Sequence, residues 1–346
     1  MSELVTLTID NREVKAAPGT SVLRAALDNG IYVPHLCDHK DLTSVGVCRV
    51  CLVEIEGRRP TVSCMTPVEE GMVVHTASED LDKTRKINLE LLVLNHDYDC
   101  QNCAQNSKCQ LQDLTRYIGI DEERINAMRD PDLSWDLDQS NPYYLRDMNR
   151  CVRCGICVRT CEEVQGDECI DFAFRGIETT ISVLGDKEIL DSTCTTCGEC
   201  VVRCPVGALV PRNAIEPTYE VETVCPFCGC GCGILVGARG DKIVSSRGIP
   251  DYPSSGGSLC VKGRYGLGFV NSPERLTTPL IRKDGELVEA SWEEALSLVA
   301  EKLGQYKGDQ FATIASAKCT VEDNYVIQKF TRAVMGTNNI DHCARL

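Results

Sequence analysis

Apolar and polar positions alternate at the beginning of the chain. Between residues 4 and 16 apolar side chains recur at every second position around an Asp10-Asn11 turn, which predicts a β-hairpin. Thr20 or Ser21 is expected to cap the short helix that follows. The first part of the chain is therefore predicted to place a helix beside paired strands.

A helical period replaces this alternation further along. Residues 80–95 have the roughly 3.6-residue spacing of an amphipathic helix, and residues 111–120 (LQDLTRYIGI) form a second such stretch. The apolar side predicted for the first helix consists of Leu81, Ile87, Leu91 and Leu94. The polar, Asp-rich segment 121–142 is predicted to be a linker or a wrapping loop.

Near the other end, apolar runs and helical periods follow one another as in an α/β domain. Ser291 and Glu294 predict a capping box, and Thr320 is expected to cap a second helix. Residues 311–315 (FATIA) and 338–342 (NNIDH) predict strands before and after that second helix. Because such a layer needs further strands and helices to cover its faces, this last domain looks unfinished.

Composition narrows the classes of protein that the chain can belong to. With 36 Lys and Arg against 51 Asp and Glu, the net charge is −15, which argues against nucleic acid as the main partner. No apolar run approaches the roughly 18 residues of a membrane helix, and the polar, acidic start is no signal peptide. We therefore predict a cytoplasmic protein without a membrane span.

The 23 cysteines change the picture most. A reducing cytosol argues against a disulfide framework, so metal binding, redox catalysis and chance are the remaining explanations. The sequence CVRCGICVRTC recurs about 43 residues later as CTTCGECVVRC. Such triplets are typical of two-cluster ferredoxins, in which the fourth cysteine of each run ligates the other cluster.

This crossover rule assigns two [4Fe–4S] clusters to the repeat. The ligands predicted for the first cluster are Cys151, Cys154, Cys157 and Cys204. The ligands predicted for the second cluster are Cys194, Cys197, Cys200 and Cys161. Zinc is the alternative, although it favours paired C-x₂-C knuckles over triplets.

Three further groups have the spacing of metal ligands. A [4Fe–4S] cluster is predicted for Cys225, Cys228, Cys232 and Cys260, and the role of the intervening Cys230 stays open. A second is predicted for His96, Cys100, Cys103 and Cys109, with a zinc site as the alternative. Either a [2Fe–2S] cluster or structural zinc is predicted for Cys37, Cys48, Cys51 and Cys64. The cysteines without a metal role, expected to be small buried apolar residues, are Cys169, Cys230, Cys319 and Cys343.

Several motifs resemble known families. The N-terminal region shared by the large peripheral subunit of respiratory complex I and [FeFe]-hydrogenases resembles three stretches of this chain, GVCRVCLVEI, HDYDCQNC and CQLQDL. This resemblance favours iron–sulfur clusters over zinc at the Cys37–Cys64 and His96–Cys109 groups. VCPFCGCGCGILV and SLCVKGRYGLGFV resemble the cluster-bearing opening of molybdopterin oxidoreductases. In this order, the motifs resemble the catalytic subunit of cytosolic NAD(P)- or ferredoxin-linked molybdenum or tungsten formate dehydrogenases.

The resemblance implies an α+β multidomain architecture. Its expected parts are a β-grasp [2Fe–2S] ferredoxin-like domain (1–79), a His-Cys₃ [4Fe–4S] domain (80–120), a linker (121–140), a bacterial-type 2[4Fe–4S] ferredoxin domain (141–215), a molybdopterin oxidoreductase [4Fe–4S] domain (220–275) and an incomplete α/β molybdopterin-binding domain (276–346).

It also implies a function in electron transfer. The expected cofactors are one [2Fe–2S] cluster, four [4Fe–4S] clusters and a molybdenum or tungsten bis-pterin guanine dinucleotide. Lys262 matches the lysine that lies between cluster and pterin in the family and carries the electron path; a solvated surface lysine is the alternative. Because no G-x-G-x-x-G follows a strand, NAD(P) and flavin chemistry is expected on a partner. That partner is a diaphorase-type iron–sulfur subunit, a ferredoxin or a hydrogenase subunit.

The end of the chain carries one more expectation. SAKCTVEDNY and GTNNIDHCARL resemble the stretch of formate dehydrogenases just before the selenocysteine or cysteine that ligates the metal. A selenocysteine codon (UGA) read as a stop after Leu346 is our hypothesis for this ending, and a chain cut deliberately is the alternative. The complete protein is therefore expected to oxidise formate, whereas these 346 residues lack the metal ligand. A complex I-type subunit, an [FeFe]-hydrogenase and a non-enzymatic polyferredoxin are the competing interpretations.

Overall fold

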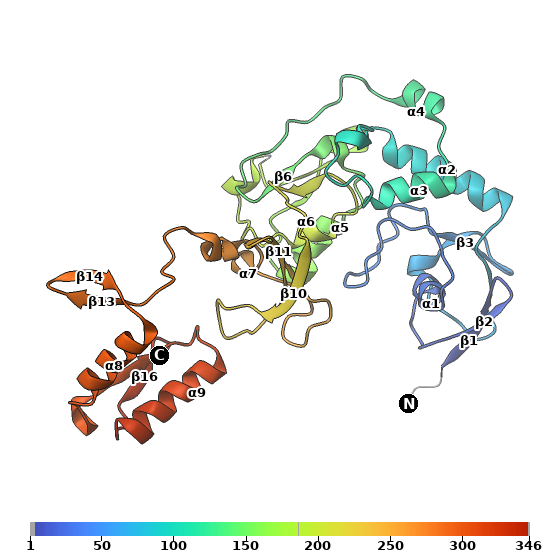
Figure 1. The fold of residues 1–346 in the computed structure, drawn as a ribbon. Coiled ribbons are helices and arrows are strands. Elements are labelled where there is room, and N and C mark those ends of the chain that lie inside the picture. The colour runs from blue at the N-terminus through green and yellow to red at the C-terminus, as the bar shows by residue number, and fades with distance from the viewer. Residues whose placement is uncertain (1–3, 186, 345–346) are drawn as a thin grey trace. The chain divides into compact units, whose positions relative to one another are not determined.

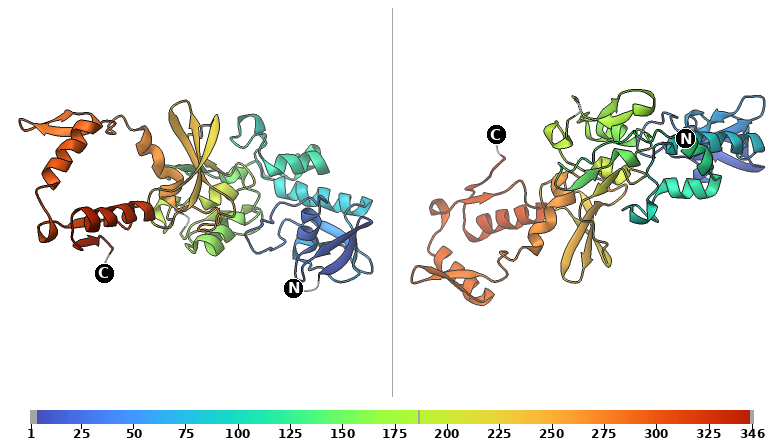
Figure 2. Two further views of the ribbon diagram at one scale, coloured as in Figure 1. Left: turned by 60° about the horizontal axis from the view of Figure 1, so that its bottom comes forward. Right: turned by 90° about the horizontal axis from the view of Figure 1, so that it is seen from above.

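The computed structural model describes residues 4–185 and 187–344. The chain divides between Asn213 and Ala214 into two units, here called unit 1 and unit 2. Figure 1 traces the chain from the N-terminus in blue to the C-terminus in red, and Figure 2 gives two further views. Among the helices described, none combines the length and the apolar character needed to cross a membrane.

Unit 1 begins with a five-stranded sheet in the order β2-β1-β5-β3-β4. Its elements are β1 (Val5–Ile9), β2 (Arg12–Ala16), β3 (Leu52–Ile55), β4 (Thr61–Val62), β5 (Val73–His75) and the helix α1 (Val22–Asp28). Strands β1 and β2 form the predicted hairpin, and Asp10 and Asn11 take the positive φ values of 47° and 63° that a tight two-residue turn requires. Ser21 caps α1 by accepting the amide hydrogen of Arg24, as predicted.

The predicted amphipathic helix is present as α2 (Glu79–Val93), but its buried face is only partly the predicted one. Leu81 is buried and Leu94 packs against the core, as predicted, whereas Ile87 and Leu91 are half exposed, so the prediction is wrong at these two positions. The buried positions are Leu81, Arg85, Leu89, Glu90 and Val93. Two of these are charged, and Nη2 of Arg85 donates hydrogen bonds to the backbone oxygens of Leu52 and Thr76. A search for apolar residues alone could not find this stripe.

The segment predicted to be a linker also contains a helix. After α3 (Gln110–Ile118), residues Glu122–Met128 form α4, which Asp121 caps through the amide of Arg124. Ile125 of α4 is buried in the core, and the Arg124 guanidinium donates two hydrogen bonds of 2.7 Å to the Glu90 carboxylate on α2. Arg129, directly after α4, adds hydrogen bonds to the backbone oxygens of Leu94 and His96. This first part of the segment is therefore packed structure.

The cysteine repeat folds into two similar halves. Its elements are β6 (Tyr144–Arg146), α5 (Ile156–Arg159), a π-helical turn (Thr160–Gln165), β7 (Asp171–Ala173), β8 (Thr180–Ser182), α6 (Glu199–Arg203) and β9 (Leu209–Pro211). Strands β6 and β9, which begin and end this region in the sequence, pair with each other antiparallel. In each half a glycine with positive φ, Gly155 or Gly198, begins the short helix after the second cysteine.

Unit 2 begins with an antiparallel sheet in the order β10-β11-β12. Its elements are β10 (Tyr219–Val224), β11 (Gly233–Arg239), β12 (Lys242–Gly248), α7 (Val261–Tyr265), β13 (Leu280–Lys283), β14 (Glu286–Glu289), α8 (Trp292–Leu303), β15 (Thr313–Ala315), α9 (Val321–Lys329), a second π-helical turn (Phe330–Val334) and β16 (Ile340–His342). Strands β15 and β16 are parallel neighbours, which confirms the predicted strand–helix–strand order.

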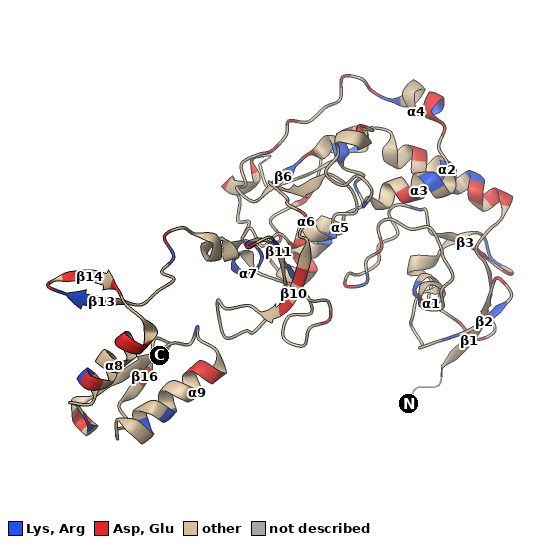
Figure 3. Cartoon of the chain, in the orientation of Figure 1, with Lys and Arg blue, Asp and Glu red and all other residues tan. Residues whose placement is uncertain are grey.

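Both predicted helix caps of unit 2 are present, Ser291 on α8 and Thr320 on α9, but they differ in whether the capping box is complete. Ser291 Oγ accepts the amide hydrogen of Glu294 at 3.1 Å, but the Glu294 carboxylate binds Lys283 Nζ at 2.8 Å on β13. Figure 3 colours the basic residues of β13 blue and the acidic residues of α8 red. The predicted capping box at Ser291 is therefore only half formed, because the ion pair occupies the glutamate. A complete box is found instead at Thr320, with Asp323 as its partner.

Candidate metal centres

The first four cysteines lie in two contacting pairs. Each of them is at most 2 % exposed, and thiol hydrogen bonds join Cys37 to Cys48 and Cys51 to Cys64. The contact with Cys37 lowers the pKa of Cys48 to about 6, and the contact with Cys64 lowers the pKa of Cys51. Since the thiolate is the form that binds metal, each pair offers one thiolate readily. Two pairs fit the two irons of a [2Fe–2S] cluster.

A buried arginine ties this site to the cysteine repeat. Arg159, at the end of α5, donates hydrogen bonds of 2.6 Å to the backbone oxygens of Cys37 and Thr43. Its side chain therefore fixes the loop that carries the first cysteine against α5, the helix that contains Cys157. The sequence could not predict this contact, because Arg159 and Cys37 are more than a hundred positions apart in the chain.

The predicted ligands His96, Cys100, Cys103 and Cys109 line one cavity of about 40 Å³. His96 is buried, and its Nδ1 atom has no hydrogen-bond partner in the part of the chain that the structure describes. Burial lowers the pKa of His96 to about 4, so the imidazole is neutral at pH 7. A buried, neutral and unpartnered ring nitrogen fits a metal ligand, because an orphaned polar atom would otherwise destabilise the fold.

Two residues outside the predicted set shape this cavity. A Cβ atom at Gly207 would overlap Cys103 Sγ, so only glycine leaves room for that sulfur. The Arg150 guanidinium forms a hydrogen bond with the Cys103 thiol and an ion pair of 3.2 Å with Asp97. Sequence reasoning missed both residues. The one available signal was the position of Gly207 three residues after the last cysteine of the repeat.

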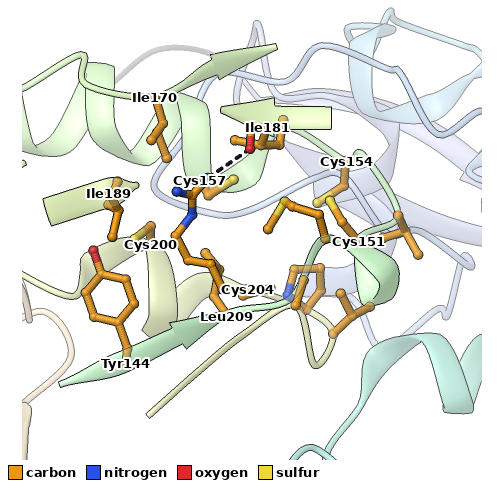
Figure 4. A pocket seen from close by; sticks show the side chains of 17 residues that line it. Tyr144, Cys151, Cys154, Cys157, Ile170, Ile181, Ile189, Cys200, Cys204 and Leu209 are labelled. Atoms are coloured by element: carbon orange, nitrogen blue, oxygen red, sulfur yellow. Dashed lines mark hydrogen bonds between the residues drawn. The ribbon is translucent and has the colours of Figure 1, made fainter. Parts of the chain in front are cut away.

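The cysteines assigned to the first ferredoxin cluster also share a cavity. Its volume is about 30 Å³, and Figure 4 shows sulfur atoms and mainly apolar side chains around it. The Arg146 guanidinium also lines the cavity and donates to the Ile181 oxygen. The cysteines that line it are Cys151, Cys154, Cys157, Cys204 and Cys200. Burial raises the pKa of Cys151, Cys154 and Cys157. Metal binding here must therefore release protons, since a thiol loses its proton when it ligates.

A second cavity of about 20 Å³ lies beside the first and shares Tyr144 and Cys200 with it. The cysteines that line it are Cys161, Cys194, Cys197, Cys200 and Cys169. The Tyr144 hydroxyl lies 3.5 Å from Cys194 Sγ, and burial raises the pKa of this tyrosine, so it stays a donor. Tyr144 and Cys169 were absent from the predicted site.

The two halves of the repeat present their first cysteine in the same way. The amide of Arg153 donates to Cys151 Sγ at 3.3 Å, and the amide of Thr196 donates to Cys194 Sγ at 3.3 Å. Both donors have a positive φ, 54° and 59°, which turns each amide back toward the sulfur two residues earlier. Such N–H donors stabilise a thiolate, as an iron ligand requires.

The last predicted group lies in unit 2 and is more exposed. Cys225 is buried and Cys232 partly buried, whereas Cys228 and Cys260 are exposed. Cys230 Sγ is 3.5 Å from Cys232 Sγ, so the fifth cysteine of this loop does lie at the group. Lys262 is exposed in α7, two residues after Cys260, and its electron-path role stays a prediction.

The expectation for the remaining cysteines was wrong. Cys230, Cys319 and Cys343 are exposed, and Cys169 is only partly buried, so none of them is a small residue of the core. The position matched to the metal-ligand boundary, Leu346, lies outside the described residues.

None of these groups has the geometry of a single-ion site. Among the described residues, no three His, Cys, Asp or Glu side chains converge closely enough to hold one metal ion. Zinc needs its ligands around one point at about 2.0–2.3 Å. Sulfur atoms that surround a cavity instead fit a cluster of several irons, so the His96 group and the two groups of the repeat favour iron–sulfur clusters over zinc.

Five family descriptions match consecutive stretches of the chain. These are a 2Fe-2S iron-sulfur cluster binding domain (2–79), an NADH-ubiquinone oxidoreductase-G iron-sulfur binding region (85–124), an NADH-quinone oxidoreductase subunit 3 ferredoxin-like domain (141–210), a molybdopterin oxidoreductase Fe4S4 domain (218–272) and a molybdopterin oxidoreductase (275–346). Together they match the α+β multidomain architecture expected from the sequence.

Curated relatives extend this likeness across the whole chain. A G-type subunit of the NADH-quinone oxidoreductase of Rhizobium meliloti (strain 1021) is 38% identical over 99% of the chain, and the alpha subunit of the NADPH-Fe(3+) oxidoreductase of Geobacter sulfurreducens is 36% identical over 99%. YrhE of Bacillus subtilis (strain 168), whose formate dehydrogenase assignment is provisional, is 33% identical over 99%. The chain spans 40% of the length of each of these relatives.

A solved structure agrees with these relatives. A chain of the NAD+-reducing [NiFe]-hydrogenase in its H2-reduced state is 32% identical, with a TM-score of 0.56 over 62% of this chain and 90% of the hydrogenase chain. Residues 218–272 and 275–346 thus match molybdopterin oxidoreductase domains, and the iron–sulfur domains before them are similar to those of the G-type subunits of NADH-quinone oxidoreductases.

Proposed function

We propose that this chain is the electron-transfer portion of the catalytic subunit of a formate dehydrogenase (CO₂ reductase). In this proposal it relays electrons between a molybdenum or tungsten bis-pterin guanine dinucleotide and a cytoplasmic partner of the diaphorase, ferredoxin or hydrogenase type. One observation carries it. Unit 1 contains two cysteine cavities built from a complete ferredoxin repeat, and molybdopterin oxidoreductase sequence follows in the same chain.

The proposal includes one [2Fe–2S] and four [4Fe–4S] clusters in the domains predicted from the sequence. The proposed ligands are Cys37, Cys48, Cys51 and Cys64 for the [2Fe–2S] cluster, and His96, Cys100, Cys103, Cys109, the eight cysteines of the repeat, Cys225, Cys228, Cys232 and Cys260 for the others. Clusters of these types accept and donate single electrons. Lys262 is proposed to contact the pterin, since the short helix that carries it begins directly after Cys260.

The protein's own contribution is to keep these sites dry and to hold their sulfurs. The cavity of the first ferredoxin site is lined by Ile181, Ile189 and Leu209, which exclude water. Amide hydrogens point at Cys151 and Cys194, and such donors stabilise a negatively charged sulfur. Because both ferredoxin cavities include Cys200, the two proposed clusters are neighbours, as an electron relay needs.

The experiment is a metal and reduction assay on the complete protein, purified with its native subunits. We expect molybdenum or tungsten by mass spectrometry, and bleaching of the visible iron–sulfur absorption on addition of formate. Replacing formate with acetate is the control. Protein that contains neither metal and is reduced by NADH but not by formate would contradict the proposal.

That outcome is the signature of the second candidate, a complex I-type NADH dehydrogenase subunit. The 38% identity to a G-type subunit of an NADH-quinone oxidoreductase and the match of residues 85–124 to that family favour it. The two candidates share the relay of unit 1 and differ in whether a metal-bound pterin supplies its electrons. Metal content therefore separates them even before any substrate is added.

A further inference from the structure

Cys169 lies outside the repeated cysteine spacing but inside the second ferredoxin cavity. Its Sγ atom is 3.5 Å from Cys161 Sγ, and its thiol is hydrogen-bonded to that of Cys194. Both neighbours are proposed ligands of one cluster. Five sulfurs therefore line a cavity in which a [4Fe–4S] cluster takes four ligands.

The surroundings of the three sulfurs distinguish ligand from neighbour. Cys161 Sγ receives the backbone amides of Cys169 and Ile170, and Cys194 Sγ receives the Thr196 amide. These donors stabilise a thiolate at either position. Cys169 is the one of these three sulfurs that lies outside the repeated spacing, and a cysteine that binds no metal ordinarily keeps its proton at neutral pH. The geometry thus places a thiol donor between two ligand sulfurs.

We propose that Cys169 is a positioning residue rather than a ligand, and that it donates its S–H hydrogen to the ligand sulfur of Cys161 or Cys194. A hydrogen bond to a ligand sulfur disperses negative charge, and the reduced cluster carries more of that charge than the oxidised one. The contact therefore raises the reduction potential of this cluster. The inference rests on the proposed ligation by Cys161, Cys194, Cys197 and Cys200, and it is independent of formate as the substrate.

The experiment compares Cys169→Ala and Cys169→Ser with the wild-type chain after cluster assembly. Iron per chain and an EPR-monitored redox titration are measured for each protein. We expect unchanged iron in both variants, a lower midpoint potential for this cluster in Cys169→Ala, and a potential restored toward wild type in Cys169→Ser, whose hydroxyl can donate. Cys319→Ala, an exposed cysteine of unit 2, is the matched control.

Cys161→Ala completes the design, because it removes a proposed ligand and should abolish the [4Fe–4S] signal of this cluster. Loss of about four irons in Cys169→Ala would show that Cys169 is itself a ligand and would overturn the inference. An unchanged midpoint potential in Cys169→Ala would also overturn it. If the wild-type chain lacks this cluster altogether, the proposed ligation fails, and that failure is visible before any variant is made.

Discussion

The cysteine sites of the two units differ in what surrounds them. In unit 1 most of the cysteines belong to, or pack against, two cores that include residues of helices α2 and α3 and of the sheet of β1 to β5. In unit 2 the core at the cysteine loop contains only Cys225, Ile234, Leu259 and Leu267 among the described residues. The sulfurs of unit 1 are therefore positioned by packing, whereas those of unit 2 depend on a loop with little around it.

The helices show the same contrast. Leu89 of α2 is fully buried, while α8 and α9 of unit 2 have no buried residue among the described positions. Trp292 and Leu296 of α8 are 69 % and 59 % exposed, and Ile314 of β15 is 83 % exposed. An apolar helix face contributes stability only when something covers it, so equal substitutions should have unequal effects in the two units.

The largest expected difference is in the loss of iron. When the assembled chain is treated with an oxidant and a chelator, the Cys225–Cys260 site should lose its iron first, because Cys228 and Cys260 are exposed. About four of roughly 18 irons should leave in a fast phase. Iron assays and Mössbauer spectra over time measure it, and Cys225→Ala should lack that phase. Fast loss from the unit 1 sites instead would break the comparison.

The next effect concerns two arginine–carboxylate pairs. Arg146 and Asp138 in unit 1 are 2.9 Å apart and nearly buried, whereas Arg247 and Glu220 in unit 2 are half to one-quarter exposed. Arg146→Met should cost about 3–5 kcal/mol because it leaves the aspartate without its buried partner. Arg247→Met should cost about 0–1 kcal/mol. Denaturant unfolding measures both, and equal costs would contradict the difference in burial.

A core substitution sharpens the contrast between the helices. Leu89→Ala should lower the free energy of unfolding of unit 1 by about 2–5 kcal/mol, because it opens a cavity in a packed core. Leu296→Ala in α8 should change stability by about 0.5 kcal/mol or less. If Leu296→Ala lowered the free energy of unfolding of a longer polypeptide by as much as Leu89→Ala does, another element would have to cover α8.

A smaller effect is expected from pH, through the contribution of the Arg146–Asp138 pair to the free energy of unfolding. Burial opposes ionisation of Asp138, but hydrogen bonds from Ser140 and Ile189 and the Arg146 charge lower its pKa below the ordinary value. Its contribution is therefore complete above its ordinary pKa of about 4 and is lost as the pH falls through the folded-state pKa. The difference in stability between wild type and Arg146→Met should narrow in that acidic range. A constant difference down to the lowest pH would refute this assignment.

The smallest expected effect is at the helix caps. Ser21 caps α1 in unit 1 and Thr320 caps α9 in unit 2, each through a side-chain oxygen. Alanine at either position should cost about 1 kcal/mol, since it removes one hydrogen bond to an otherwise unsatisfied amide. Thermal unfolding measures both. Here the two units should agree, because a cap acts locally and does not depend on what covers the helix.

Local features were predictable from the sequence because they depend on neighbouring residues. The Asp10-Asn11 turn, the Ser21 cap and the order β15, α9, β16 follow from residues close in the chain. The buried face of α2 was not predictable in this way. Arg85 is buried against backbone oxygens distant in the chain, and Glu90 is buried against Arg124. The spacing of hydrophobic residues does not indicate either partner.

The same division holds for the candidate sites. The sequence by itself determined which cysteines form groups, because ligand spacing is a local property of a loop. Only the tertiary structure decided that Gly207 leaves room for Cys103, that Arg159 holds the loop of Cys37, and that Cys169 lies between two proposed ligands. These contacts join segments distant in the chain, so they exist only once the core has packed.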